Sequence, residues 1–145
     1  MAIISNVIAR GQLVPLHFMQ ADLAASQTDV QLSVAAVDNA ADDQLQGIEY
    51  AMPFAGEVVA VSYTTSAAAT TGTMTIGATF AGTEDTDTTI TVTTGTSGYG
   101  IVPRGKATFA AGEKIGCEIT TGGTWDGTTA DLVATVWVLL YIAGI

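Results

Sequence analysis

Strict alternation of apolar and small polar residues is the feature that most constrains this fold, and segment 73–80 shows it most clearly. Apolar side chains alternate there with threonine and glycine: Met74, Ile76, Ala78 and Phe80 against Thr73, Thr75, Gly77 and Thr79. Successive side chains of a strand point to opposite faces of a sheet, whereas a helix needs a period of 3.6 residues. The segment therefore predicts a β-strand with one buried face.

Further segments are expected to be strands, at 28–34, 48–52, 56–65, 89–93, 99–102, 114–120 and 131–142. In 56–65 the alternation predicts Val59, Val61 and Tyr63 on one face and Val58, Ala60 and Ser62 on the other. Glycine- and threonine-rich turns separate the segments, and none of helical length has a 3.6-residue period. The predicted fold class is all-β, an antiparallel β-sandwich or jelly roll with an extended N-terminal arm. The expected core contains Met74, Ile76, Phe80, Ile90, Val92, Ile115 and Ile119.

The chain is expected to divide into an N-terminal arm with one strand, residues 1–43, and a β-body, residues 44–145. Pro15 lacks a backbone N–H, so it restricts any strand around it to a sheet edge or an extended segment. An apolar arm of this kind can add strand or groove contacts to a neighbouring protein. The residues expected to bind a partner in this way are Ile3, Ile4, Val7, Ile8, Leu13, Leu16 and Phe18.

The last predicted strand, 131–142, is apolar on both faces, although a one-sided sheet should have a polar outer face. Two interpretations remain open. The strand is central and covered on both sides within one chain, or its face near Trp137 and Tyr141 lies at a subunit interface, where aromatic residues are enriched. Charged residues make up only 12% of the chain, which favours a homo-oligomer in which neighbours cover part of the surface.

The charge and hydropathy of the chain argue against nucleic acid and membrane as direct partners. The chain has a formal net charge of -10 and only 4 lysine and arginine residues, so no basic cluster for nucleic-acid phosphates is expected. The late apolar run from Leu132 to Ile142 is interrupted by Thr135 and is too short to span a bilayer as a helix. The N-terminus lacks the basic leader of a signal peptide, so synthesis in the cytoplasm is expected.

Motifs for catalysis or metal binding are not found in the sequence. His17 is the single histidine and Cys117 the single cysteine, which together cannot build a zinc site or a convincing nucleophile system. Cys117 is expected to be a buried, inert thiol because it occupies an inward strand position. The acidic turn from Glu84 to Asp87 is either a solvated hairpin tip or a weak calcium site. The chain is predicted not to be an enzyme and to need no cofactor.

Three stretches resemble the small β-domains of tailed-bacteriophage structural proteins. They are Met-Pro-Phe-Ala-Gly-Glu-Val-Val-Ala-Val-Ser at 52–62, Phe-Ala-Ala-Gly-Glu-Lys-Ile-Gly-Cys-Glu-Ile-Thr-Thr at 109–121, and the run from Trp125 to Leu139. The chain looks most like capsid decoration, or cement, proteins of the jelly-roll type. The resemblance implies a phage virion, a trimer, a position on the capsid surface, and the major capsid protein as partner.

Two functions are therefore weighed. The first is decoration and stabilisation of a capsid by binding across major capsid protein subunits. The alternative is a tail or fibre component with a carbohydrate- or receptor-binding role, which would use exposed aromatics such as Tyr99 and Trp125. Burial of Trp125 would count against the alternative.

Overall fold

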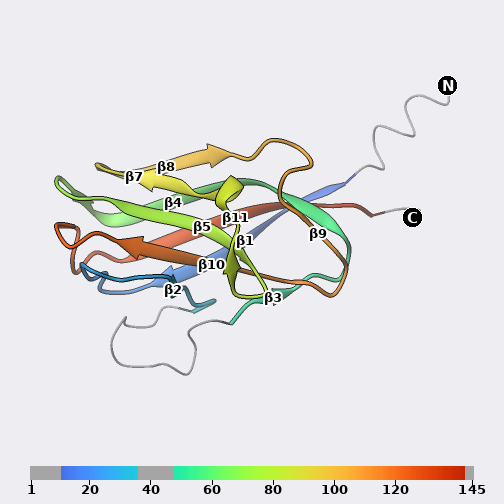
Figure 1. The fold of residues 1–145 in the computed structure, drawn as a ribbon, viewed down its shortest axis with the longest axis horizontal. Coiled ribbons are helices and arrows are strands. Elements are labelled where there is room, and N and C mark those ends of the chain that lie inside the picture. The colour runs from blue at the N-terminus through green and yellow to red at the C-terminus, as the bar shows by residue number, and fades with distance from the viewer. Residues whose placement is uncertain (1–10, 36–47, 143–145) are drawn as a thin grey trace.

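The computed structural model describes residues 11–35 and 48–142, which form an all-β sandwich (Figure 1). The predicted all-β antiparallel sandwich is thereby confirmed. The strands are β1 (Gln12–Gln20), β2 (Val30–Gln31), β3 (Tyr50–Ala51), β4 (Gly56–Ala69), β5 (Met74–Phe80), β6 (Thr83–Glu84), β7 (Ile90–Val92), β8 (Gly95–Ile101), β9 (Thr108–Phe109), β10 (Lys114–Thr121) and β11 (Leu132–Leu140). A single 3₁₀ turn, η1 (Thr86–Thr88), lies between β6 and β7 in the described chain.

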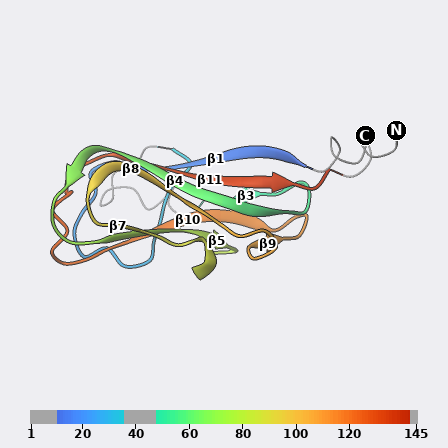
Figure 2. The same cartoon turned by 90° about the horizontal axis from the view of Figure 1, so that it is seen from above.

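Two antiparallel sheets pack face to face, and Figure 2 shows them as separate layers. The first has the order β1-β11-β4-β8, with β9 also paired to β4. The second has the order β2-β10-β5-β6, with β3 paired to β10 and β7 to β5. The long-range pairs are nested: β1 with β11, β2 with β10, β4 with β8 and β5 with β7. This nesting, with consecutive strands distributed over two sheets, is the arrangement of a jelly roll.

The core lies between the two sheets, where the inward side chains of both meet. Of the seven residues expected there, the buried ones are Met74, Ile76, Val92, Ile115 and Ile119. Phe80 and Ile90 are partly buried and pack against the same cluster. Alternation therefore identified the inward face of β5, β7 and β10 correctly.

A β-bulge in β4 changes the expected alternation. Val58 and Val61 are both buried, whereas Val59 and Ala60 between them are only partly buried. Opposite them on β11, Val138 pairs with Val58 and the adjacent Trp137 pairs with Ala60, so Val59 is the extra residue. One inserted residue exchanges the two faces of the strand. The expectation that Val59 shares the face of Val61 and Tyr63 was therefore wrong.

Residues 12–35 belong to the sandwich and not to an arm. The strand β1 pairs with β11 along its whole length, and β2 pairs with β10 in the other sheet. Leu16 is buried and Phe18 has no exposed surface, because both side chains point between the sheets. The boundary expected after residue 43 therefore does not coincide with the edge of the fold. As Pro15 predicted, β1 is an edge strand: β11 is its only neighbouring strand in the described sheet, and Met19 forms an isolated bridge to Ser33 on the other side.

Candidate interaction surface

The solvent side of the β1-β11-β4-β8 sheet, called the outer face below, is the candidate functional site. Strand register aligns its side chains in rows, and one row runs Pro15, Trp137, Ala60 and Ile101 across the four strands. The outer face consists of Leu13, Pro15, His17 and Met19 on β1, Val133, Thr135, Trp137 and Leu139 on β11, Ala60, Ser62 and Thr64 on β4, and Ser97, Tyr99 and Ile101 on β8.

The outer face is apolar and almost free of charge. Among the residues that define it, His17 alone has a side chain that can carry a positive charge. Charge is otherwise confined to the end of the face, where Glu57 lies opposite Leu139 and pairs with Arg104. Large apolar side chains are left in contact with solvent: Tyr99 is 76% exposed, Ile101 70%, Leu13 55% and Val133 40%. In an antiparallel sheet with one face in solvent, the residues on that face are normally polar. Depletion of charge together with exposed aromatic and aliphatic side chains is typical of the centre of a protein–protein interface.

Polar groups on the outer face hydrogen-bond to each other. The half-buried Trp137 donates its indole N–H to the Ser62 hydroxyl at 3.0 Å. His17 Nδ1 and the Thr135 hydroxyl share a second hydrogen bond, also of 3.0 Å. A partner that covers this region can therefore leave both of these hydrogen bonds in place, and breaking them without replacement would cost free energy.

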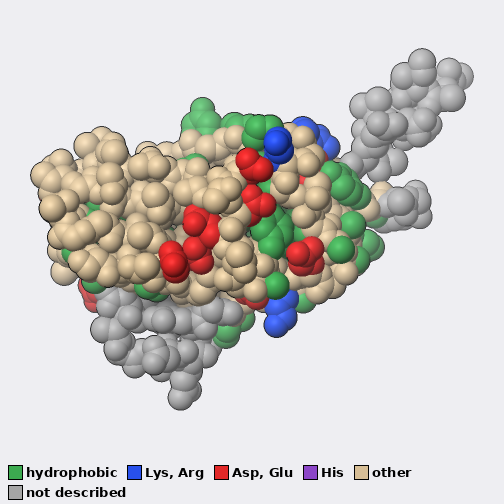
Figure 3. Space-filling model, viewed as in Figure 1, with side chains coloured by type: hydrophobic (Ala, Val, Ile, Leu, Met, Phe, Trp, Pro, Cys, Tyr) green, Lys and Arg blue, Asp and Glu red, His purple; other side chains and the backbone are tan. Residues whose placement is uncertain are grey.

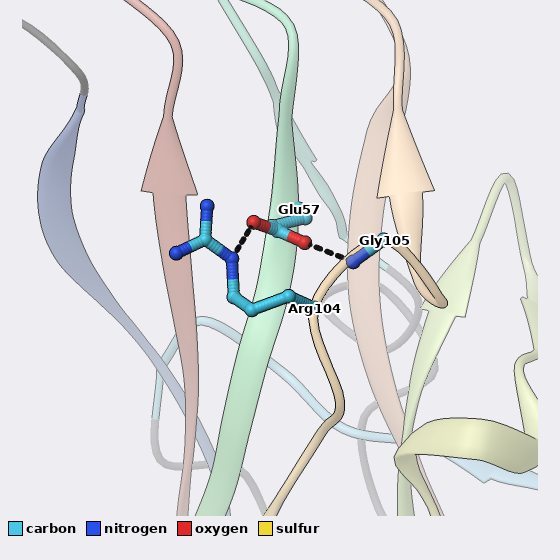
Figure 4. Close-up of polar contacts among 3 residues, drawn as sticks. All are labelled: Glu57, Arg104 and Gly105. Carbon is cyan, nitrogen blue, oxygen red and sulfur yellow. Dashed lines mark hydrogen bonds and ion pairs between the residues drawn. The ribbon is translucent and has the colours of Figure 1, made fainter.

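At one end of this sheet, a buried carboxylate fixes the loop that follows β8 (Figure 4). Glu57 is 1% exposed, and it accepts hydrogen bonds from the Gly105 N–H at 2.5 Å and from Arg104 Nε. Burial raises the pKa of Glu57, but hydrogen bonds from Gly105, Tyr141 and Arg104 outweigh burial and hold the pKa below its usual value. The group is therefore an ionised structural anchor, with Tyr141 as one of its partners.

The predicted site residues fall into three groups. Trp137 and Leu13 lie on the outer face, and Tyr141, which is 40% exposed, lies at its Glu57 end. Leu16 and Phe18 were expected to contact a partner but are buried in the chain's own core. The remaining arm residues, Ile3, Ile4, Val7 and Ile8, lie outside the described residues.

Sequence reasoning missed Ile101 as a surface residue. The strand expected there covered only 99–102, and Tyr99 was considered for contact with a ligand only as a possible sugar-binding aromatic. The strand in fact begins at Gly95, with Ser97, Tyr99 and Ile101 outward and Gly98 and Gly100 inward. The alternation of glycine with larger residues was the available signal, although glycine more often marks turns.

The solvent side of the second sheet has the opposite character and is acidic, as Figure 3 shows. Glu118 on β10 accepts a hydrogen bond of 2.5 Å from Gln31 Nε2, and Glu84 accepts one of 2.6 Å from the Thr89 hydroxyl. Burial raises the pKa of Glu118, and the charges of Glu84 and Asp29 raise it further. Glu118 itself is only 6% exposed, but the half-buried Glu84 and the exposed Asp29 beside it reach solvent. A surface of repelling carboxylates favours solvent or a basic neighbour, so the two sheets present unlike surfaces.

Three further features of the described chain bear on metal binding and catalysis. No group of three or more His, Cys, Asp or Glu is placed to hold a metal ion in residues 11–35 and 48–142. The acidic turn is closed by its own contacts, since Asp85 accepts a hydrogen bond of 2.8 Å from the Asp87 N–H. Cys117 has no exposed surface, and burial raises the pKa of its thiol. The thiolate needed for nucleophilic chemistry is therefore strongly disfavoured.

Trp125, proposed above as a sugar-binding aromatic, is 4% exposed. It packs in the core cluster and is not available to a ligand at the surface. No helix in the described ranges is long and apolar enough to cross a membrane. No family model matches the chain, and no curated protein or solved structure matches it either, so its function is inferred from the chemistry of its own surfaces.

Proposed function

We propose that this chain is a structural protein of a tailed-phage virion, which decorates and stabilises the capsid by binding across major capsid protein subunits. It is synthesised in the host cytoplasm and acts on the capsid surface as a homo-oligomer, a trimer by resemblance to cement proteins. It carries out no catalysis. Its work is to bind the assembled capsid and not the separated subunits, which stabilises the assembly by mass action.

The observation that carries this proposal is the uncharged, apolar outer face centred on Trp137. Apolar surface removed from water contributes about 25 cal/mol per Å². A stable interface buries apolar surface of the kind that is exposed here on Tyr99, Ile101, Leu13 and Val133. A rigid sheet presents these side chains without a large ordering cost on binding. Exposed apolar area and a rigid sheet are both favourable for a permanent contact with other subunits of a particle.

The orientation of the chain in an assembly follows from its two unlike sheets. The outer face, with Trp137 and with Tyr141 at its end, would be covered by neighbouring subunits of the assembly. The acidic side of the second sheet, with Glu84 and the neighbouring Asp29, would remain in solvent. A net charge of -10 keeps such a protein soluble before it assembles.

The alternative function, a carbohydrate- or receptor-binding tail or fibre component, has less support. Of the two aromatics it would use, Trp125 is buried and Tyr99 is exposed on β8. Small-molecule sites are usually concave, with polar groups converging on an apolar floor. Tyr99 instead continues the face that contains Ile101 and Trp137.

Charges introduced on the outer face should weaken capsid binding without unfolding the chain. Leu13→Asp and Val133→Asp each place a carboxylate at an exposed position, on β1 and β11 respectively. We expect each to weaken binding to undecorated capsids by about tenfold or more, because a buried unpaired charge is strongly unfavourable. Co-sedimentation of the purified variant with capsids measures this.

Thr91→Asp is the matched control, because Thr91 is exposed on β7 in the opposite sheet. It adds the same charge and should bind as the unmodified chain does. Circular dichroism verifies that all three variants keep the β fold. If the Leu13 and Val133 variants bound capsids as tightly as the control, the outer face would not be the binding surface.

A further inference from the structure

The strand β8 leaves one side of its backbone without a partner strand. In the described part of the chain, β8 pairs with β4 and with no other strand, and it ends the order β1-β11-β4-β8. Each residue from Gly95 to Ile101 is exposed or only partly buried. The N–H and C=O groups on the free side therefore face solvent, in a row that another extended chain can pair with.

The other edges of the described sheets carry protection that β8 lacks. The opposite edge strand, β1, contains Pro15, which removes a donor. At the margins of the second sheet, β2 has 2 residues, β6 has 2 and β7 has 3. The β8 strand has 7 residues, Gly-Thr-Ser-Gly-Tyr-Gly-Ile, with no charge and no proline. Proteins usually block such an edge with charge, proline or a short strand.

The glycines of β8 hold the strand close to the sandwich. A Cβ at Gly98 would lie 2.7 Å from Tyr63 Cε1, and one at Gly100 would overlap Ile90 Cγ2. Both glycines therefore face inward, over Tyr63 and Ile90. The outward positions are Ser97, Tyr99 and Ile101, so the free edge is supported by the sandwich beneath it and continuous with the outer face.

Charges at the two ends of this sheet indicate what can pair with the edge. The loop after β8 carries two exposed cations, Lys106 and Arg104, of which Arg104 is paired with the carboxylate of Glu57 within the chain. At the other end, the loops carry the exposed carboxylates Asp22, Asp126 and Asp131. Asp126 is held ionised there, because hydrogen bonds from the Thr70 hydroxyl and from the N–H groups of Thr71 and Thr70 lower its pKa.

A second copy of the chain fits this charge pattern in one orientation only. When two copies lie side by side in parallel, their like-charged ends meet. In an antiparallel pair related by a two-fold axis, the end with Arg104 and Lys106 meets the end with Asp126 and Asp131. The strand itself contains no charge, so it can lie against its own copy without repulsion between identical residues.

We propose that β8 pairs with β8 of a second copy, antiparallel about a two-fold axis, so that the two outer faces join in one continuous sheet. The contact is isologous, with the same residues used by both copies. It does not require the proposed capsid function and uses a different surface from Leu13 and Val133. If the trimer also forms, this contact links one trimer to the next.

A charge exchange at Ser97, close to the centre of β8, tests the pairing in the free protein. In a symmetric pair, residue 97 of each copy lies near its counterpart. Ser97→Lys alone and Ser97→Glu alone should each weaken self-association by about tenfold or more, because like charges then face each other. An equal mixture of the two variants should restore association. Sedimentation equilibrium at several concentrations measures all three samples.

Controls at Thr91, on the other sheet, separate a local effect from a change in net charge. Thr91→Lys and Thr91→Glu should associate as the unmodified chain does, which should sediment with an even number of copies. In addition, Ser97→Cys should form a disulfide-linked dimer on oxidation and Thr91→Cys should not, since the native Cys117 is buried. A monomer at all concentrations, or Ser97 variants that associate normally, would overturn the proposal.

Discussion

Replacing Phe18 by alanine is expected to lower the free energy of unfolding by about 3–5 kcal/mol, the usual cost of removing a fully buried phenylalanine. Phe18 has no exposed surface, and its ring packs edge-on against Tyr50 with centroids 5.5 Å apart. The contact joins β1 in one sheet to β3 in the other. Chemical denaturation, followed by tryptophan fluorescence, measures the loss.

Leu13→Ala is the control for this prediction, since it removes an apolar side chain from the same strand. Leu13 is 55% exposed on the outer face, so we expect a change within about 0.5 kcal/mol. The comparison distinguishes a strand built into the fold from an arm that contacts only a partner. Equal and small effects at Phe18 and Leu13 would show that β1 is not part of the folded core.

Replacing Glu57 by glutamine is expected to cost about 2–4 kcal/mol at pH 7, because a buried acceptor is lost from a hydrogen-bonded site. Glu57 accepts from both the Gly105 N–H and Arg104, whereas a glutamine amide keeps a single oxygen. The Arg104 side chain is 68% exposed, so its ion pair contributes little. Most of the cost comes from the unsatisfied Gly105 N–H and the buried polar group. Asp87→Asn, at an exposed carboxylate, should have little effect.

The effect of Glu57 should depend on pH in a defined direction. Its pKa is lower in the folded chain than in the unfolded chain, so ionisation favours the fold. That contribution is present above the unfolded value of about 4.3 and is lost as the pH falls through the folded value. The stability difference between the unmodified chain and the Glu57→Gln variant should therefore shrink below about pH 4. A difference that stayed constant from pH 7 to pH 3 would contradict this role.

Strands that are polar on one side and buried on the other were predictable from the sequence. The segment around Met74 and Ile76 and that around Ile115 and Ile119 alternate cleanly, and the structure places them side by side as β5 and β10. In these strands the apolar side chains face the core and the alternate side chains face away from it, so the sequence pattern agrees with the tertiary packing. The fold class followed from such strands.

The role of β1 was not predictable in the same way. Leu16 and Phe18 are apolar residues next to a proline, and apolar residues suit both an internal edge strand and an arm that binds elsewhere. The choice depends on pairing with β11, more than a hundred residues away in the chain. Local sequence contains no information on such a partner. The bulge at Val59 has the same origin, because it is defined by the register of β4 against β11.

The candidate site was partly predictable. Because β11 is apolar on both faces, the sequence indicated that the face with Trp137 is covered by something other than solvent. In the structure one face of β11 lies in the core and the face with Trp137 belongs to the outer face. Tyr99 and Ile101 were not connected with it, because only the pairing of β8 with β4 brings them into the same sheet. A shared surface is a property of register across strands and cannot be read from one segment.

Electron cryomicroscopy of the parent particle tests the central claim, a capsid-stabilising role, most directly. The proposal predicts density for this jelly roll on the outside of the capsid, bridging major capsid protein subunits, with the outer face around Trp137 covered by neighbouring subunits and the Glu118 sheet in solvent. Density confined to the tail or fibres, or a capsid-bound chain whose outer face is free in solvent, would contradict it.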